Sequence, residues 1–371
     1  MTGLPPKLDG VGHYSLALAK EMARNHGVLT RFVVGDLEWG GGNISDFPVY
    51  RLSEHTAEAF CSLLAEVCAE VSKTNSSMSC TVILHLSAYG YHKHACPFWL
   101  EEGLRWWLGE GEQRRLLTIF HELYAIGPPW KKIFWFSPFQ RMIAIRILKM
   151  SELVLTVAQK YGDRLHEWDP RKIGKITVFP PFSTIGEPKI IRPLHERTRR
   201  LIVFGHKANR SRIYRDSFDA LVEACRLLNI YEICDIGTNL GDKFPEINGV
   251  NFIATGPLPG AEISVMMCDS VAGFVDYGSG YLAKSSIFAA YCAHGLIPVL
   301  DEINDSEADG LFVGNQYIVP RLHSNVLTDY EAKIVADHAL TWYKSHSLKS
   351  HAVVLANDLL VIPPEKSGKQ K

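Results

Sequence analysis

Short apolar runs alternate with helix-length amphipathic segments through most of this chain, and this alternation limits its possible folds more than any other feature. The runs are rich in β-branched residues, which favours strands, and the segments between them repeat apolar residues with the period of a helix. Strands joined through helices form parallel sheets with helices on their faces, so we predict an α/β fold. The predicted strands are residues 31–35, 81–86, 116–121, 153–158, 175–179, 201–205, 230–236, 250–254, 271–276 and 296–300. The clearest predicted helices are residues 14–24, 57–72, 139–150, 217–228 and 285–293.

A polar, proline-bearing stretch that starts at Pro180-Pro181 interrupts this alternation. A chain of 371 residues is also too long for one ordinary core, so we expect two domains. The predicted parts are an N-terminal Rossmann-like domain at 1–182, a linker at 183–200 and a C-terminal Rossmann-like domain at 201–340. We expect a C-terminal helix at about 340–362 to complete the first domain, followed by a frayed, charged tail at Pro363–Lys371.

The composition argues against several classes of protein. A formal net charge of −1 disfavours a protein whose main ligand is nucleic acid. The eight cysteines are scattered without a CxxC pair, so we expect buried free thiols in a reducing compartment rather than disulfides or a zinc site. The N-terminus does not resemble a signal peptide, and no apolar run reaches the ~18 residues of a membrane span. We therefore expect a cytoplasmic protein with at most peripheral contact to the inner face of the membrane.

The first motif is a glycine-containing turn, Pro5-Pro6-Lys7-Leu8-Asp9-Gly10-Val11-Gly12, which runs directly into an amphipathic helix. Glycines at such a turn let backbone N–H groups approach an anion, and the helix N-terminus favours negative charge. Gly10, Val11 and Gly12 are therefore candidates for contact with a phosphate, and the alternative is a plain tight turn. Because so few residues precede the prolines, the first strand is either very short or the chain as given lacks a few residues of it.

Two loops that follow neighbouring predicted strands carry histidines. His121 and Glu122 follow one strand, and His85, Tyr89 and Tyr91 lie at or after the end of the other. Ligands of open α/β sheets bind beyond the carboxyl ends of strands, and imidazole, hydroxyl and aromatic groups together suit a carbohydrate. The alternative is that these residues only close their loops. Neither loop supplies enough ligands for a metal site.

The strongest motif is residues 277–286, Tyr-Gly-Ser-Gly-Tyr-Leu-Ala-Lys-Ser-Ser, which joins a strand to a helix of small residues. Lys284, Ser285 and Ser286 open this helix, and an ammonium, hydroxyls and N–H groups at a helix N-terminus form a site for a diphosphate. Tyr281 is a candidate contact to the sugar. The alternative is a serine N-cap beside a solvated lysine.

Two further segments carry positive charge. Arg210 and Arg212 follow the first strand of the second half and are candidates to neutralise the phosphates of a leaving nucleotide, unless they belong to a solvated basic loop. Residues 130–149 mix aromatic and basic side chains, which suits contact with a membrane surface that presents a lipid-linked acceptor. For this second segment we favour the commoner explanation, a core-packing segment with solvated charges.

Together and in this order, the motifs resemble the GT-B glycosyltransferases, specifically the retaining family 4 type, also called glycosyltransferase group 1. PPKLDGVGHYSLALAKEM resembles the family's glycine-rich N-terminal loop and first helix, FHEL its HD or HE segment, and YLAKSSIFAAYCAHGLIPVL its donor-binding loop and helix. The resemblance covers almost the whole chain. Its narrower form is to bacterial, including cyanobacterial, enzymes that make exopolysaccharide or envelope polysaccharide.

This resemblance implies two Rossmann-like domains whose parallel sheets face each other across a cleft. It also implies sugar transfer from a UDP- or GDP-sugar, with UDP favoured, to a glycan or lipid-linked acceptor without a metal. The C-terminal domain would bind the donor and the N-terminal domain the acceptor. Carried over by position, the phosphate contacts are Gly10, Val11, Gly12, Arg210, Arg212, Lys284, Ser285 and Ser286, and the nucleobase contacts include Gly256 and Leu258. The implied catalytic residues are His121, Arg212 and Lys284, and His85, Tyr89, Tyr91, Glu122 and Tyr281 would contact the acceptor or the sugar.

The chain departs from the family at its E-x7-E motif, where Ala283 and Ala290 replace the two glutamates. In the family's front-face retaining route the departing phosphate takes the acceptor proton, whereas an inverting route would need a base, for which His121 is the candidate. The departure leaves open a catalytically silent sugar-nucleotide-binding protein. Another alternative with the same two-domain fold is a non-hydrolysing sugar-nucleotide epimerase.

Overall fold

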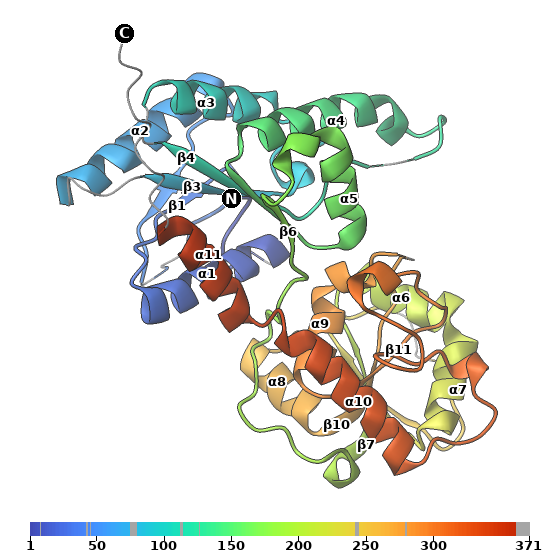
Figure 1. Ribbon diagram of the computed structural model, residues 1–371. Helices are drawn as coiled ribbons and strands as arrows, with labels where there is room; N and C mark the ends of the chain where they lie inside the picture. The colour runs from blue at the N-terminus through green and yellow to red at the C-terminus, as the bar shows by residue number, and fades with distance from the viewer. Residues whose placement is uncertain are drawn as a thin grey trace. The chain divides into compact units, whose positions relative to one another are not determined.

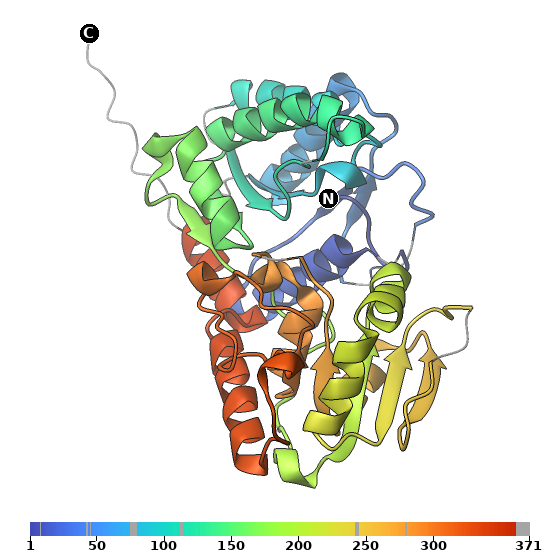
Figure 2. The same cartoon turned by 90° about the vertical axis from the view of Figure 1, so that its right-hand side faces the viewer.

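A computed structural model describes residues 1–7, 9–41, 44, 46–74, 80–111, 114–125, 127–241, 245–278 and 280–360 (Figures 1 and 2). These residues form two compact units. Unit 1 contains Met1–Thr156, Tyr161–Val178 and Leu348–Leu360, and unit 2 contains Val157–Lys160 and Phe179–Ser347. Ser279 and the predicted tail at Pro363–Lys371 lie outside the described residues.

Unit 1 is a parallel α/β unit. Its helices are α1 (Gly10–His26), α2 (Ala57–Thr74), α3 (Phe98–Gly109), α4 (Lys132–Met150), α5 (Gln159–Trp168), whose first two residues belong to unit 2, and α11 (Leu348–Leu360). Its strands are β1 (Phe32–Val34), β2 (Val49–Arg51), β3 (Thr81–Leu86), β4 (Arg115–Phe120), β5 (Leu153–Thr156) and β6 (Ile176–Val178). Strands β3 to β6 pair in parallel in chain order, and β1 pairs in parallel with β2. Because crossovers between parallel strands are right-handed, α3 and α4 cover one face of the larger sheet, while α1 and α11 pack together on the other (Figure 1).

The core of unit 1 follows from the apolar spacing of its elements. Leu100, Leu104 and Trp107 repeat at helical intervals on α3 and are buried against the sheet, where Leu86 and Phe120 point into the same core. Each such side chain contributes about 1.5–3 kcal/mol by leaving water. This burial holds the carboxyl ends of β3 and β4 side by side.

The short extended segment before α1 pairs with β1. The Gly35 N–H donates to the Met1 carbonyl at 2.9 Å. Helix α1 passes close to this segment, because a Cβ added at Gly12 would lie 2.3 Å from the Gly3 carbonyl oxygen. Glycine at position 12 is therefore required for packing within unit 1.

Unit 2 is a second parallel α/β unit. Its helices are α6 (Lys207–Asp216), α7 (Phe218–Leu227), α8 (Gly260–Cys268), α9 (Ser286–Ala293) and α10 (Asp329–Lys344). Its strands are β7 (Thr198–Phe204), β8 (Glu232–Ile236), β9 (Asn251–Gly256), β10 (Ser270–Phe274) and β11 (Ile297–Val299), in the order β11-β10-β7-β8-β9. Helices α6 and α7 lie on one face of the sheet, and α8 and α9 on the other (Figure 1). The segment predicted as a linker, 183–200, belongs to unit 2 and includes the start of β7.

The α/β prediction is confirmed, with two differences among the elements. Strand β2 was not predicted, because Val49-Tyr50-Arg51 lies in a mixed polar segment after Pro48 rather than in an apolar run. Helix α4 begins at Lys132 rather than at residue 139 and passes through Pro138. Proline removes a single N–H donor, here the one facing the Phe134 carbonyl, and the rest of the helix holds its geometry through burial.

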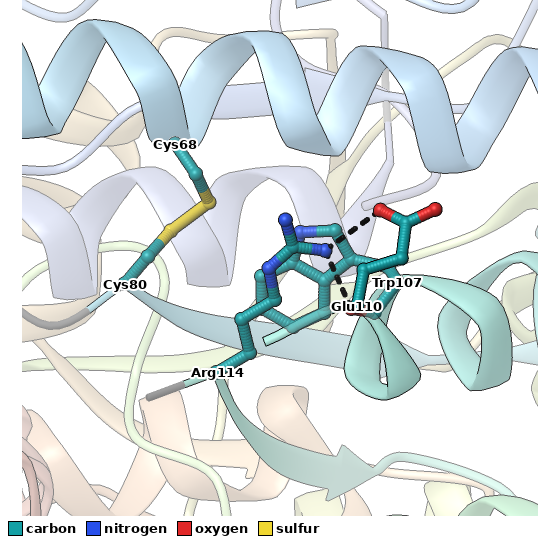
Figure 3. Close-up of a disulfide and its surroundings, with 5 residues drawn as sticks. All are labelled: Cys68, Cys80, Trp107, Glu110 and Arg114. Carbon is teal, nitrogen blue, oxygen red and sulfur yellow. Dashed lines mark hydrogen bonds and ion pairs between the residues drawn. A yellow bond between two sulfur atoms is a disulfide. The ribbon is translucent and has the colours of Figure 1, made fainter. Parts of the chain in front are cut away.

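A disulfide joins Cys68, near the end of α2, to Cys80, just before β3 (Figure 3). Their Cα atoms are 5.9 Å apart, which suits a disulfide. The prediction of free thiols is wrong for this pair, because spacing along the sequence does not reveal that α2 returns Cys68 to the start of β3. The cysteines therefore no longer argue for a reducing compartment.

Arg114, near this disulfide in Figure 3, donates hydrogen bonds to the Glu110 carboxylate at 3.0 Å and to the Trp107 carbonyl at 2.6 Å.

None of the helices formed by the described residues is long and apolar enough to cross a bilayer.

Candidate functional site

The strand order of unit 2 changes direction at β7. The chain proceeds from β7 through β8 to β9 on one side, and returns to the other side with β10 and β11. The connections after β7 and β10 therefore leave the sheet toward opposite faces. In open α/β sheets a ligand crevice lies between two such loops. The candidate site of unit 2 is built at this divergence.

Tyr291 of α9 lies at the divergence and is completely buried. Its hydroxyl accepts from the Phe204 N–H and has the carbonyl oxygens of Ile202 and Phe274 as acceptors, each at 3.2 Å. Gly273 of β10 makes room for the ring, since a Cβ there would lie 2.6 Å from it. Tyr291 thus fixes α9 against the ends of β7 and β10.

The glycine loop after β10 is held by the loop after β11. The Asn304 side chain accepts from the Gly280 N–H at 2.8 Å and donates to the Gly278 carbonyl at 3.0 Å. Ser306 donates to the Asn304 amide oxygen at 2.7 Å and accepts from the Leu282 N–H at 3.2 Å. Asn304 and Ser306 are both buried, so the loop conformation is fixed by an internal polar network.

Lys284, Ser285 and Ser286 lie at the N-terminus of α9. Lys284 ends a short 3-10 turn (Leu282–Lys284) and is half-buried. Ser285 is the N-cap, and its buried hydroxyl accepts from the Phe288 N–H at 3.1 Å. Ser286 is the first helical residue, so its N–H lies in the turn that has no intrahelical acceptors and carries partial positive charge. This end of the helix suits an anion through its backbone, while the Ser285 side chain serves the helix itself.

Arg212 spans the divergence. Its Nε donates to the Asp276 carboxylate at 2.6 Å, and its Nη2 donates to Asn209 at 3.3 Å. Because α6 follows β7 and Asp276 follows β10, the pair links the two diverging connections. The Arg212 side chain is 45% exposed and Asp276 is 25% exposed, so this guanidinium can meet a ligand from solvent.

Arg210 has a different environment. Its side chain is fully buried, pairs with the carboxylate of Asp235, and donates to the carbonyls of Gly205 and Thr238. Gly237 is shaped around it, because a Cβ there would lie 2.7 Å from the guanidinium. The sequence grouped Arg210 with Arg212 as phosphate contacts, but the structure commits Arg210 to the interior of unit 2.

Lys160 is a cation near the glycine loop that the sequence did not indicate. Its ammonium lies 3.2 Å from the Asp305 carboxylate and 5.7 Å from the ring centre of Tyr281. It also lies against Gly280, where a Cβ would come within 1.7 Å of it. One face of Tyr281 is therefore covered by a positive charge.

Gly256 and Leu258 lie at the end of β9, the far edge of the sheet. Gly256 has a φ of +72° and accepts from the Gly237 N–H at 3.1 Å, and Leu258 is half-buried. Strand β9 is three positions from β10 in the sheet, which corresponds to roughly 14 Å at the usual strand spacing. These residues therefore lie at the same carboxyl edge of the sheet as the loop after β10, two strands beyond β7.

In unit 1, His121 and His85 lie side by side because β3 and β4 are paired. The backbone N–H of His121 donates to the Leu86 carbonyl at 3.0 Å. Between the two side chains, His85 Nδ1 lies 3.2 Å from His121 Nε2. His85 is buried and His121 is half-buried. Burial, and then the neighbouring His121, hold the pKa of His85 well below its ordinary value of 6.5, so this ring is neutral near pH 7. One of the two rings donates and the other accepts.

Tyr14 of α1 and His351 of α11 complete this cluster. The Tyr14 hydroxyl lies 2.8 Å from His351 Nδ1, and its ring meets His121 edge-on at a centroid distance of 5.2 Å. Burial raises the pKa of Tyr14, so its hydroxyl remains protonated. His121 is thus backed by the neutral groups of His85 and Tyr14.

The N-terminus of α1 is occupied by a carboxylate of the chain. Asp9 is the N-cap and accepts from the Val11 N–H at 2.9 Å and the Gly12 N–H at 3.4 Å. Gly10 is exposed, and Thr2 donates to the other Asp9 oxygen at 2.6 Å. A phosphate expected at Gly10–Gly12 would meet this negative charge, so the turn suits a neutral hydroxyl better than an anion.

The remaining sugar candidates separate by exposure. Tyr91 is buried, and its hydroxyl donates to the His85 carbonyl at 2.9 Å, so it supports the cluster from within. Tyr89 is exposed and Glu122 is half-buried at the same edge of the sheet. Only Tyr89 and Glu122 of these three remain accessible to an acceptor.

Two further observations concern the family's glutamate positions and groups of metal-ligating side chains. Ala283 and Ala290, which align with the family's two glutamates, are both fully buried. Within the described part of the chain, no three His, Cys, Asp or Glu side chains are grouped to hold a metal ion.

The sequence missed several residues that build these sites. Asn304 and Ser306 directly follow a predicted strand, so the rule that ligands lie beyond carboxyl ends would have found them. Lys160 and His351 carry no such signal, because helices bring them to their places from distant parts of the sequence.

No protein-family model matches the chain, and no curated protein matches it by sequence. Solved structures do match it by fold. An α-glucosyltransferase (AGT) in complex with UDP is 11% identical with a TM-score of 0.55, covering 94% of this chain and 96% of its own. HepE from Anabaena, in complex with UDP and glucose, is 12% identical with a TM-score of 0.57, covering 97% and 98%. The trehalose-6-phosphate synthase OtsA is 12% identical with a TM-score of 0.58, covering 96% of each chain.

These structures are glycosyltransferases of the GT-B class, and at such low identity the likeness concerns the fold. The chain therefore has the GT-B fold, as the sequence predicts.

Proposed function

We propose that this protein is a glycosyltransferase that takes a sugar from a UDP-sugar and passes it to a glycan or lipid-linked acceptor. The observation that carries the proposal is the divergence of β7 and β10, where Arg212, the N-terminus of α9 and an internally fixed glycine loop meet. UDP is the favoured nucleotide because AGT and HepE are both described with UDP bound. GDP remains the alternative nucleotide.

In this proposal the diphosphate lies at the divergence. Arg212 and Lys284 neutralise its charge, and the N–H groups at the start of α9, at Ser286, donate to its oxygens. Since Ser285 caps the helix and Arg210 is buried, we assign neither side chain to the phosphates. The nucleobase would lie toward Gly256 and Leu258, which follow β9 at the same carboxyl edge of the sheet.

Charge stabilisation on the leaving diphosphate drives the proposed reaction. The bond between the sugar C1 and the phosphate oxygen breaks, the electron pair leaves with the diphosphate, and the acceptor oxygen bonds to C1. In a retaining reaction the diphosphate oxygen takes the acceptor proton. Because Asn304 and Ser306 already hold the loop, it needs no reorganisation when charge develops on the diphosphate, and the N–H groups at the start of α9 and the Arg212 guanidinium are the donors that meet this charge.

The histidine cluster at the edge of unit 1 would receive the uncharged reactants. We assign His121 to a hydroxyl of the transferred sugar, Glu122 and Tyr89 to the acceptor, and the turn at Gly10–Gly12 to a neutral hydroxyl of the donor. His85 and Tyr14 orient His121 without touching substrate. In an inverting reaction His121 would be the base.

A second candidate function is a silent sugar-nucleotide-binding protein. One observation favours it. Buried alanines, Ala283 and Ala290, stand at the family's two glutamate positions, so neither position supplies a carboxylate. The phosphate groups of the site would serve binding equally well.

The test follows release of UDP or GDP from a panel of sugar nucleotides, with and without glycan acceptors. We expect turnover with at least one UDP-sugar, and a loss of at least about tenfold in Arg212→Ala and in Lys284→Ala, since a charge-assisted hydrogen bond contributes about 1.5–3 kcal/mol. Arg215→Ala is the matched control, because Arg215 lies on the same helix and pairs with Asp216 on the surface. Tight nucleotide binding without turnover across all acceptors would favour the binding protein. Epimer formation without release of nucleotide would point to the epimerase instead.

We further propose a cytoplasmic enzyme of polysaccharide synthesis, of the retaining family 4 type. The supporting observation is the sequence resemblance of the two glycine-containing loops and the FHEL segment. The disulfide between Cys68 and Cys80 runs against a reducing compartment, so alkylation of the protein in intact cells is the direct test of location.

A further inference from the structure

Helix α4 and the residues before it present large aromatic side chains to solvent. Trp130 is 83% exposed and Trp135 is 67% exposed, and Phe134 and Phe139 are exposed as well. The sequence favoured a core-packing segment with solvated charges here. The later turns of α4 do pack in the core, but these four aromatic side chains lie in solvent. We refer to Trp130, Phe134, Trp135, Phe139, Arg146 and Lys149 as the aromatic–basic face.

The spacing of these residues places them along one side of the helix. Trp135, Phe139, Arg146 and Lys149 follow one another at intervals of four, seven and three residues, which keeps them in one stripe. The opposite side of α4, which includes Ala144 and Leu148, is buried in the core of unit 1. The helix is therefore amphipathic in an unusual sense, with one apolar side in the core and a second aromatic side in water.

Local contacts hold the aromatic residues in place outside the core. The Trp135 indole N–H donates to the Pro129 carbonyl at 3.1 Å, and the Trp135 and Phe134 rings meet edge-on at 5.5 Å. Phe139 packs edge-on against the exposed Phe98 of α3 at 6.3 Å. The rings thus form an ordered surface.

The same region is strongly positive. Residues 123–150 contain five lysines and arginines and no aspartate or glutamate. Arg146 and Lys149, with Arg105 of α3, line a hollow of about 340 Å³ whose floor includes the buried Glu101. Glu101 lies 3.2 Å from Arg146 and 3.7 Å from Arg105, so one carboxylate holds two guanidinium groups at this surface.

Acidic and flanking groups do not cancel this charge. Glu102 lies 3.3 Å from Arg105 at the edge of the hollow, and Arg141 turns aside to the ring of Trp168 at 5.6 Å. With Glu101 and Glu102 counted against Arg105, Arg146 and Lys149, the hollow keeps one net positive charge. The exposed Lys131 and Lys132 add two more at the aromatic end of the helix.

We propose that the aromatic–basic face binds the surface of a lipid bilayer that contains anionic headgroups. Tryptophan and phenylalanine partition into the headgroup region, while lysine and arginine beside them bind lipid phosphates and extend their charges to water. A second copy of the chain fits less well, because a two-fold contact would bring two positive faces together. A protein partner fits less well because lysine is depleted from the cores of protein interfaces. The inference goes beyond sugar transfer and does not depend on it, since neither donor nor acceptor takes part.

The test is cosedimentation of the full chain, without nucleotide, with vesicles of phosphatidylcholine alone or with about a third phosphatidylglycerol. We expect binding to the anionic vesicles that weakens as salt is raised, and little binding to the neutral ones. Lys131→Glu/Lys132→Glu should weaken binding at least about tenfold, from the typical contribution of a basic residue near an anionic surface. The control is Lys175→Glu/Lys189→Glu, which makes the same change of net charge at exposed positions that are not part of the face.

A second pair of variants tests the aromatic half of the face. Trp130→Ala/Trp135→Ala should lower binding to anionic vesicles several-fold, while Ile190→Ala/Tyr330→Ala, which removes equally exposed apolar side chains from unit 2, should not. The proposal is overturned if the parent protein binds neither vesicle, if it binds both alike, or if each variant pair behaves like its control. Self-association of the parent that either variant pair abolishes, with no vesicle binding, would assign the face to a second copy and also overturn it.

Discussion

The two units present contrasting chemistry at the carboxyl edges of their sheets. In unit 2 the edge carries cations, Arg212 and Lys160, around a loop held by buried polar side chains. In unit 1 the edge carries His121, backed by the neutral groups of His85 and Tyr14. Both edges arise from parallel strands, so the fold alone does not explain the difference.

The contrast suits the proposed function, in which each unit binds a different part of the reactants. A charged diphosphate needs cations and fixed N–H donors, because their orientation is then prepared before charge develops. A sugar or a glycan acceptor offers neutral hydroxyls, which neutral imidazole and phenol groups can bond without carrying a charge out of water. We therefore associate unit 2 with the phosphates and unit 1 with the sugar and the acceptor.

The largest effect should come from the buried ion pair of unit 2. Arg210→Ala leaves Asp235 buried and unpaired, which should cost about 3–5 kcal/mol in the free energy of unfolding. Hydrogen exchange measured separately for peptides of each unit should show loss of protection in unit 2 alone. Arg215→Ala should leave both units unchanged. If Arg210→Ala kept the hydrogen-exchange protection of unit 2 but bound nucleotide more weakly, Arg210 would instead be a phosphate contact.

The next effect concerns unit 1. Reduction of Cys68–Cys80 opens a loop with a sequence separation of 12 residues and should lower the free energy of unfolding by about 3 kcal/mol. Urea unfolding with and without reductant measures the change, and exchange should increase in unit 1 only. A Cys68→Ser/Cys80→Ser protein should behave like the reduced parent and no longer respond to reductant. No response of the parent itself would mean that the two thiols are not joined in solution.

A smaller effect should separate Arg212 from Arg210. Arg212→Ala removes a half-exposed side chain, so stability should change little, while the dissociation constant for UDP should rise about 10- to 100-fold through loss of a charge-assisted hydrogen bond. Calorimetric titration measures the constant, and thermal unfolding supplies the control. Equal affinity in parent and variant would remove Arg212 from the site.

The smallest effect is a pH dependence in unit 1. The pKa of His85 is lower in the folded protein than its ordinary value of 6.5, so the folded state binds fewer protons. Below about pH 6.5 the unfolded chain takes up a proton at His85 that the folded protein does not. The free energy of unfolding therefore falls as the pH falls below that value, by about 1 kcal/mol near pH 5.5. His346 in unit 2, with a pKa lowered by burial to about 4, acts in the same direction, so the comparison is between variants.

His85→Asn should reduce the loss of stability between pH 7.5 and 5.5, and His195→Asn, at an exposed position, should leave it as in the parent. Urea unfolding at each pH gives the free energies. An unchanged slope in His85→Asn would show that His85 is not held neutral.

Much of the fold could be predicted from the sequence, because alternation of short apolar runs and amphipathic segments specifies parallel sheets whatever the ligand. Strands β3 and β11 were recognised in this way because each lies in an apolar run, whereas β2 lies in a mixed polar segment. The start of α4 was misplaced because Pro138 breaks the local pattern, yet packing of the following turns carries the helix through it.

The site was less predictable, for reasons that are physical. Loops after strands point to a ligand edge, which is how Lys284 and His121 were found. The sequence cannot tell Arg210 from Arg212, since two residues of helix rotation decide that one enters the interior and the other faces solvent. The exposure of Trp130 and Trp135 and the meeting of Cys68 with Cys80 also depend on how elements pack in space, which the sequence pattern does not show.

The most direct test of the division between the units compares titration of the protein with UDP and with uridine. If the divergence of β7 and β10 holds a diphosphate, UDP should bind at least about 100-fold more tightly than uridine, and most of this ratio should disappear in Arg212→Ala. Equal affinity for UDP and uridine, or a ratio that Arg212→Ala leaves intact, would contradict a phosphate site in unit 2.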